Sequence, residues 1–539
     1  MKAADPDMSI ADTEKPSGTA PSAHKAQPAG EQQHGDETST AGRGAAALAA
    51  AKIYFIISGW AIYFVLPRIL SADEWGDYLL VIGLTSIVNN VIVGGTLQSV
   101  SRFTACNETM AAQVRWAGLK MQTLLGWGSA ILFVASGAVL SFWWEDTGLI
   151  PLFALMSLMV VFYSYYSVFV GSANGTRQFV KQAGLDMGYS TLKIFMVLGG
   201  AYLFARSAGR GGVAGALGGL VFTALIALTV SVFIVGLPSR RKPIQETRPL
   251  LNFALALFLF TFLLNLLMRV DLILLKRVGI GFAPPGVDGA VFASELAGRY
   301  GTAQVFAFVI MQVLMSVSFV VFPLVSRSTF ENDHDTTRRY IKQTMRVVLI
   351  TAAGLAAVLS SKSADIIGVV YPDSFRIGGT ALRFLAWGIA ALSVMIIACT
   401  IMNGAGKTRY AIIVVLFTLV LSATANYGLL YTARTPVGGL ARAGIATAGS
   451  MLIGAVVAGI FVYRLFGALM SPAGGLRILS ASALTFAAGY FMGSGSAVRT
   501  LVECSGLVLL YLVLLVLTGE LGKKDLSEIA KMFRGKKQP

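Results

Sequence analysis

Long apolar stretches alternate with short polar breaks over most of the chain. A membrane-spanning helix needs about 20 mostly apolar residues, and about fourteen stretches of that length follow one another here. Because lipid offers no hydrogen-bond partners to the backbone, each stretch is expected to be an α-helix. The pattern predicts an all-α integral membrane protein with spans near residues 47–66, 78–98, 119–141, 149–170, 187–205, 212–236, 250–275, 301–324, 343–361, 380–402, 410–431, 441–463, 476–493 and 499–518.

Four short landmarks of the first half of the chain recur in the second half in the same order. Each lies about 225 residues, or six spans, after its twin. Because six is even, both halves insert with the same orientation, which predicts two parallel six-helix lobes with two further helices appended. The pairs are 74–78 with 295–300, 100–102 with 325–327, 174–177 with 403–409, and 211–214 with 438–441.

The ends of the chain differ in composition from the spans. Residues 1–43 are rich in small and polar residues and contain no aromatic residue, so they are expected to be disordered. They also lack the apolar core of a cleaved signal, which makes the first span an uncleaved anchor. The predicted organisation is a cytoplasmic tail 1–43, an N lobe 44–248, a C lobe 249–465, two last spans in 466–519, and a basic cytoplasmic tail 520–539.

Composition and charge support a membrane protein. Apolar residues make up 55% of the chain and charged residues 13%, which is unlike soluble domains. With both termini in the cytoplasm, about 30 of the 43 Lys and Arg fall on the cytoplasmic side. The net charge of +16 therefore alternates loop by loop and does not form one nucleic-acid-binding face.

Several motifs that could indicate a disulfide, a metal site or a nucleotide site do not meet the requirements of those sites. The three cysteines, Cys106, Cys399 and Cys504, are scattered and suggest neither disulfides nor a metal site. Residues 404–408 (GAGKT) look like the end of a phosphate-binding loop, but the required first glycine is Ile401. We expect no cofactor, no metal and no enzymatic activity.

Ionisable residues inside spans are the main candidates for function, because they are costly in lipid unless they face water or a partner. Span 7 holds Arg269, and on a continuous helix Asn265, Arg269 and Lys276 share a face. Asp271 would lie about 200° from Arg269. We expect Arg269 to face a water-filled cavity, whereas Lys276, like Lys52 and Arg68 near other span ends, is expected to snorkel to the membrane surface.

A second cationic stripe lies in the first half. In span 5, Asp186, Tyr189 and Lys193 share one helix face. Further hydrogen-bonding groups at mid-membrane depth are Asn89, Asn90 and Asn426.

Residues 66–78 (LPRILSADEWGDY) resemble the signature after the first span of bacterial polysaccharide flippases. These form the polysaccharide-transporter branch (O-antigen and exopolysaccharide flippases) of the MOP superfamily, which includes the MATE drug exporters. Further similar motifs are Val270-Asp271-x-x-Leu274, Gly298-x-Tyr300-x-x-Ala303, residues 322–327 and residues 439–447. The sequence departs from the family pattern at Ser71, where a glycine is usual, and in a longer 279–294 loop.

The resemblance implies a flippase of the bacterial cytoplasmic membrane that moves an undecaprenyl-diphosphate-linked glycan for O-antigen, capsule or exopolysaccharide synthesis, alongside polymerase and export proteins. Arg269, Lys193 and Arg299 suit the diphosphate, because cationic side chains bind phosphate well. Asn265, Asn89 and Asn90 would complete the cavity. If a proton or sodium gradient drives transport, Asp271, Asp186 or Glu503 would carry the ion, since His24, His34 and His334 all lie outside the spans.

Two other functions remain open. A MATE-like drug exporter would suit an acidic cavity, whereas both stripes here are mainly basic. A membrane glycan polymerase or ligase would need catalytic groups in a sizeable outer loop, and the longest, near 276–300, has few candidates for acid or base chemistry.

Overall fold

The computed structural model describes residues 31–106, 108–207, 209–239, 247–331 and 333–522. The predicted tails therefore lie largely outside the described residues, although α1 begins within the first of them, at Glu31. The α-helices are α1 (Glu31–Val65), α2 (Ala72–Cys106), α3 (Ala111–Trp143), α4 (Ile150–Gly175), α5 (Phe179–Phe204), α6 (Gly211–Val235), α7 (Thr247–Leu267), α8 (Val270–Gly279), α9 (Gly289–Phe330), α10 (His334–Ser361), α11 (Ser363–Val370), α12 (Gly379–Gly404), α13 (Thr408–Tyr431), α14 (Pro436–Phe466), α15 (Pro472–Phe491) and α16 (Ala497–Leu517).

Every predicted span coincides with helix, and the all-α membrane architecture is confirmed. Among the described residues, eleven helices are long and apolar enough to cross a membrane, and the bent pair α7–α8 makes twelve. The predicted spans 301–324 and 476–493 lie in α9 and α15, which are not among these twelve.

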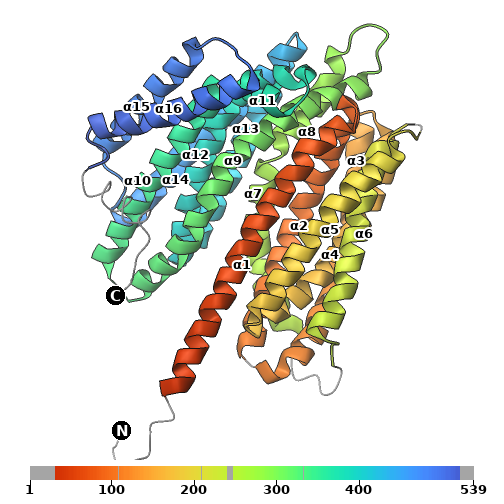
Figure 1. Cartoon of the computed structure of the whole chain (residues 1–539), viewed down its shortest axis with the longest axis vertical. Helices are drawn as coiled ribbons and strands as arrows, with labels where there is room; N and C mark the ends of the chain where they lie inside the picture. The colour runs from red at the N-terminus through yellow and green to blue at the C-terminus, as the bar shows by residue number, and fades with distance from the viewer. Residues whose placement is uncertain (1–30, 107, 208, 240–246, 332, 523–539) are drawn as a thin grey trace, which may run out of the picture.

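The two halves pack their helices in the same way. In the N lobe (α1–α6), α4 packs against α2, α3 and α6, and α5 packs against α1 and α6. In the C lobe (α7–α14), α12 packs in the same way against α9, α10 and α14, and α13 packs against α7–α8 and α14. This matching set of neighbours is what a parallel repeat requires. Figure 1 shows the N lobe on the right and the C lobe on the left, with α1 on the side of the N lobe that faces the C lobe.

The appended pair α15–α16 packs on α10 of the C lobe. Two carboxylates hold it. Near the start of α16, Glu503 pairs with Lys362 at 2.7 Å and with Arg499 at 2.7 Å. After its end, Glu520 pairs with Arg346 at 2.8 Å, so the start of the predicted basic tail 520–539 is tied to the C lobe.

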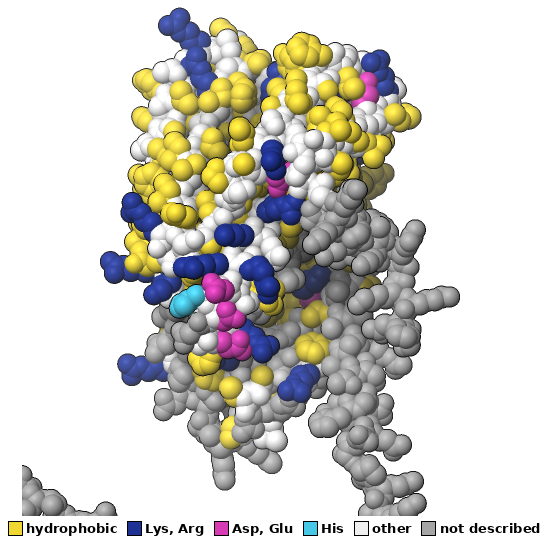
Figure 2. Space-filling model, turned by 90° about the vertical axis from the view of Figure 1, so that its left-hand side faces the viewer, with side chains coloured by type: hydrophobic (Ala, Val, Ile, Leu, Met, Phe, Trp, Pro, Cys, Tyr) yellow, Lys and Arg dark blue, Asp and Glu magenta, His cyan; other side chains and the backbone are white. Residues whose placement is uncertain are grey.

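The surface on the α10 and α15 side is divided into an apolar and a basic part. Apolar side chains dominate its upper part in Figure 2, and basic side chains gather below them. Exposed basic residues lie where α10 begins, where α14 ends and where α15 begins: Arg338, Arg339, Lys342, Arg464 and Arg477.

Candidate functional site

The lobes are joined by a buried ion cluster at the upper end of Figure 1, opposite the start of α1. Lys276 of α8 is 0% exposed, and its Nζ lies 2.8 Å from Asp146 Oδ2 and 3.5 Å from Asp77 Oδ1. Arg210, before α6, contacts the same two carboxylates at 2.6 and 2.7 Å. Ser294 of α9 donates to Asp77 Oδ1 at 2.6 Å. The prediction that Lys276 snorkels is wrong, because these acidic partners bury it between the lobes.

Electrostatics favour the charged forms of Asp146 and Arg210, the two members of the cluster that lie outside the spans. Burial alone would raise the pKa of Asp146, but hydrogen bonds and charges from Arg210 and Lys276 outweigh burial and hold that pKa below its ordinary value. Burial would lower the pKa of Arg210, and the two carboxylates instead raise it. Asp146 and Arg210 therefore form an ion pair.

Two glycines let the lobes approach closely beside this cluster. A Cβ on Gly76 of α2 would lie 1.8 Å from the Ser294 carbonyl oxygen, and a Cβ on Gly298 of α9 would lie 2.8 Å from the Ala72 oxygen. Trp75 Nε1 donates to Thr302 Oγ1 at 3.0 Å across the same contact. Gly76 and Gly298 belong to the first pair of repeated landmarks, so two corresponding segments of the repeat contact each other across the lobes.

Span 7 is broken at Arg269, which corrects the prediction of one continuous helix face. The helix α7 ends at Leu267 and α8 starts at Val270, bent by 41°. Neither Pro nor Gly lies at the break, so the local sequence does not predict it. Arg269 and Lys276 nevertheless both face α2 and α9.

Arg269 lies between the lobes. Its guanidinium is 3.5 Å from Gln304 Oε1 and 5.5 Å from the ring of Phe308, both on α9. It also approaches Gly83 of α2, where a Cβ would meet the side chain at 3.3 Å. One turn earlier, Asn265 accepts a hydrogen bond from Asn90 of α2 at 2.7 Å. No acidic residue among those described forms an ion pair with Arg269.

Asp271 lies inside the C lobe and is 1% exposed. Tyr300 donates to it at 2.7 Å, Gln304 at 2.9 Å and Thr447 at 3.1 Å. Asn426 donates in turn to Thr447, and its own Oδ1 accepts no hydrogen bond. Hydrogen bonds thus join Asp271 of α8 to α9 and α14.

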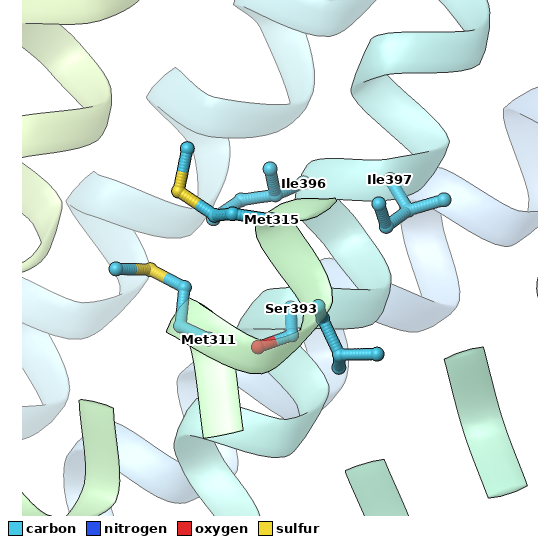
Figure 3. Close-up of a pocket in the computed structure, with 6 residues that line it drawn as sticks. Met311, Met315, Ser393, Ile396 and Ile397 are labelled. Carbon is cyan, nitrogen blue, oxygen red and sulfur yellow. The ribbon is translucent and has the colours of Figure 1, made fainter. Parts of the chain in front are cut away.

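A cavity of about 210 Å³ lies inside the N lobe and includes Lys193. Helices α1, α2, α4, α5 and α6 surround it, and its lining contains the predicted residues Asn89 and Asn90. Because Asn90 also bonds to Asn265, the cavity and Arg269 are neighbours. A second cavity, between α9 and α12 in the C lobe, has only about 10 Å³ and is lined by apolar side chains such as Met311 and Ile397 (Figure 3).

The remaining predicted residues lie elsewhere. Asp186 pairs with Lys52 at 3.0 Å, between α5 and α1. Glu503 belongs to the attachment of α16, described above. Arg299 pairs with Glu295 on its own helix, and its backbone oxygen faces Gly378 beyond α11. The structure thus groups Lys193, Asn89, Asn90, Asn265 and Arg269, and leaves Arg299, Asp186 and Glu503 apart from them.

Sequence reasoning missed part of each group. Asp77 and Arg210 were not predicted from the sequence. The outer loop that contains Asp146 has acidic residues and no cation, and this indicates a cationic partner elsewhere in the chain. Gln304 and Thr447 were also missed, because single neutral polar residues in a span give no strong signal.

Comparison with known proteins identifies the family. The family model described as Polysaccharide biosynthesis protein matches residues 65–376, more than half of the chain. The chain belongs to this family. No curated protein matches it in sequence.

Solved structures show the same fold at low sequence identity. The lipid II flippase MurJ in an inward closed conformation has a TM-score of 0.64 at 14% identity, covering 87% of this chain and 97% of MurJ. An outward-facing multidrug resistance MATE transporter has a TM-score of 0.58 at 13% identity, covering 79% and 95%. A MOP superfamily transporter from Pyrococcus furiosus has a TM-score of 0.56 at 13% identity, with the same coverage. The chain is a multi-pass membrane protein with the MOP-superfamily fold.

Proposed function

We propose that this protein is a flippase that moves a polyprenyl-diphosphate-linked oligosaccharide across the bacterial cytoplasmic membrane for O-antigen, capsule or exopolysaccharide synthesis. The observation that carries the proposal is Arg269, a cation between the lobes with no acidic ion-pair partner among the described residues, beside a cavity that contains Lys193 and Asn89. A cation held in this way suits a diphosphate, to which a guanidinium can donate two parallel hydrogen bonds. The prenyl chain would stay in lipid while the polar head passes between the lobes.

The conformation corresponds to a state closed at the end of the ion cluster. Basic residues gather toward the opposite end, where α10 begins, which supports placing that end and both termini in the cytoplasm. Opening the cluster around Lys276 and Asp146 would expose Arg269 to the other side, as alternating access requires.

Ion coupling is assigned to Asp271 rather than to Asp186 or Glu503. Asp271 is inside the C lobe, near the unpaired Oδ1 of Asn426, and a proton or a sodium ion bound there would change the hydrogen bonds that join α8, α9 and α14. Asp186 and Glu503 already pair with cations at the two ends of the bundle.

A test deletes the gene in its host and measures lipid-linked oligosaccharide on each leaflet of the cytoplasmic membrane. We expect accumulation on the cytoplasmic leaflet, restored to normal by the wild-type chain and by Lys52→Gln, and not by Arg269→Gln. Lys52 is a suitable control because it is exposed and does not line the cavity. Normal glycan distribution together with lost drug resistance would favour a drug exporter, and failure to extend or transfer a correctly flipped glycan would favour a polymerase or ligase.

A further inference from the structure

The cavity inside the N lobe contains polar groups that no protein group satisfies. Asn89 is 9% exposed, and its Oδ1 accepts no hydrogen bond, while its Nδ2 faces Met159 Sδ at 2.9 Å. Lys193 Nζ lies over the rings of Phe55 and Tyr189, at 4.7 and 5.9 Å from their centroids. Among the described residues, Lys193 has no hydrogen-bond or ion-pair partner. Unpaired groups of this kind are costly inside a membrane protein, so the cavity suits a ligand that satisfies both.

The walls of the cavity are aromatic. Four tyrosines line it, Tyr63, Tyr78, Tyr163 and Tyr189, together with Phe55. The rings of Tyr163 and Tyr189 are 5.1 Å apart and tilted by 40°. Aromatic faces bind the C–H face of a sugar ring, while hydroxyl and amide groups at the edge bind its hydroxyls. At about 30 Å³ for each water molecule, the volume corresponds to roughly seven waters, which is the space of a single sugar ring.

We infer that this cavity is a subsite for one acidic sugar of the transported glycan, with the sugar carboxylate on Lys193 and a sugar hydroxyl donating to Asn89 Oδ1. The inference rests on the proposed function and deepens it by naming the class of sugar. It separates the roles of the two cations: Arg269 binds the diphosphate, and Lys193 binds the glycan.

The spacing of the two cations supports separate roles. The two cations lie near different positions along α1. Lys193 packs on Phe55 of α1. Arg269 contacts the part of α9 that holds Phe306, and the ring of Phe306 lies 6.3 Å from that of Trp60 of α1. Five residues of a helix rise about 7.5 Å. The cations also approach from different lobes, Lys193 from α5 and Arg269 from the break between α7 and α8. Each can therefore bind a different part of one substrate.

The test measures binding to the full chain in detergent by isothermal titration calorimetry. Two farnesyl-diphosphate-linked disaccharides serve as probes. Both carry glucose on the diphosphate, followed by glucuronic acid in one probe and by glucose in the other. We expect the wild-type protein to bind the acidic probe at least about tenfold more tightly, as one charge-assisted hydrogen bond provides.

The variants identify the origin of this preference. Lys193→Gln should bring the two affinities within about twofold by weakening only the acidic probe, and Lys193→Arg should keep the preference. Lys52→Gln, a matched lysine outside the cavity, should leave both affinities unchanged.

Two results would overturn the subsite: equal binding of both probes by the wild type, or equal weakening of both by Lys193→Gln. Arg269→Gln separates this outcome from failure of the proposed function. It should weaken both probes equally, and if it changes neither affinity, the assignment of the diphosphate fails while an acidic preference that depends on Lys193 stands. If the wild type binds neither probe, both proposals fail.

Discussion

Lys276 Nζ lies 2.8 Å from Asp146 Oδ2, which joins α8 of the C lobe to the loop after α3 of the N lobe. Both side chains are buried, and Asp77 and Arg210 complete the cluster. An ion pair buried between two lobes resists separation only while both partners are present, because removing one leaves an uncompensated charge. Under the proposed alternating access, this cluster is the contact that opening at this end must break.

Lys276→Met should weaken the closed state strongly. Breaking a buried ion pair from one side costs about 3–5 kcal/mol, because Asp77 and Asp146 would remain buried with fewer cations. The measurement is the thermal unfolding midpoint in detergent, with Arg277→Met as the control. Arg277 pairs with the exposed Glu145 at 3.1 Å, a contact worth about 1 kcal/mol or less. Equal effects of the two variants would contradict the role given to the cluster.

The stability of this contact should fall in acid and should stay constant near neutral pH. The folded-state pKa of Asp146 is lowered, so its stabilising charge is fully present above the unfolded-state value of about 3.9 and is lost as pH falls through the folded-state pKa. We expect the difference in unfolding midpoint between the wild type and Asp146→Asn to stay constant from neutral pH down to about 4.5 and to shrink below about 4. A difference that already shrinks between pH 8 and 6 would argue against this assignment.

Gly76→Leu should prevent the lobes from closing at the upper end. The first added carbon would already lie 1.8 Å from the Ser294 oxygen, and that atom is backbone, so it cannot move aside easily. We expect flipping to fall at least tenfold while expression and helix content stay normal. A cysteine placed at Ala72, in a chain without its three natural cysteines, should become accessible to thiol reagents. Gly94→Leu on the same helix is the control, since a Cβ there meets no atom within 4 Å.

Asp271→Asn should separate ion coupling from folding. The amide keeps the size of the carboxylate and can still accept hydrogen bonds from Tyr300 or Thr447, so the C lobe should fold. Transport should lose its dependence on a proton or sodium gradient and fall at least tenfold. The measurement is flipping in proteoliposomes with imposed gradients, compared with Asp186→Asn, which should keep the gradient dependence.

Glu503→Gln should affect the attachment of α16 and leave gradient dependence intact. Lys362 is 2% exposed and donates to the backbone oxygens of Met492 and Gly493 as well as pairing with Glu503. Removing the carboxylate should lower the unfolding midpoint, because the buried Lys362 loses its counter-ion. If flipping by this variant no longer responds to an imposed gradient, Glu503 and not only Asp271 takes part in coupling.

Much of the candidate site could be found from the sequence because burying charge in lipid is expensive. Arg269, Lys193, Asn89 and Asn90 stood out as polar groups in apolar spans, and the structure places them around or beside one cavity. What they contact could not be predicted. Gln304 and Phe308 reach Arg269 from another helix, and neither has a pattern of its own in the sequence.

The sequence by itself determined the helices and the repeat, because lipid forces each apolar stretch of about 20 residues to satisfy its backbone as a helix, and a repeat six spans long keeps its orientation. Only the tertiary structure decided the break at Arg269 and the burial of Lys276. Contacts with α9 and α14 bury Asp271, whereas Arg269 is half-buried against α9. Lys276 sits near a span end, where either lipid headgroups or an acidic partner could receive it, and the two carboxylates of the other lobe settle that choice.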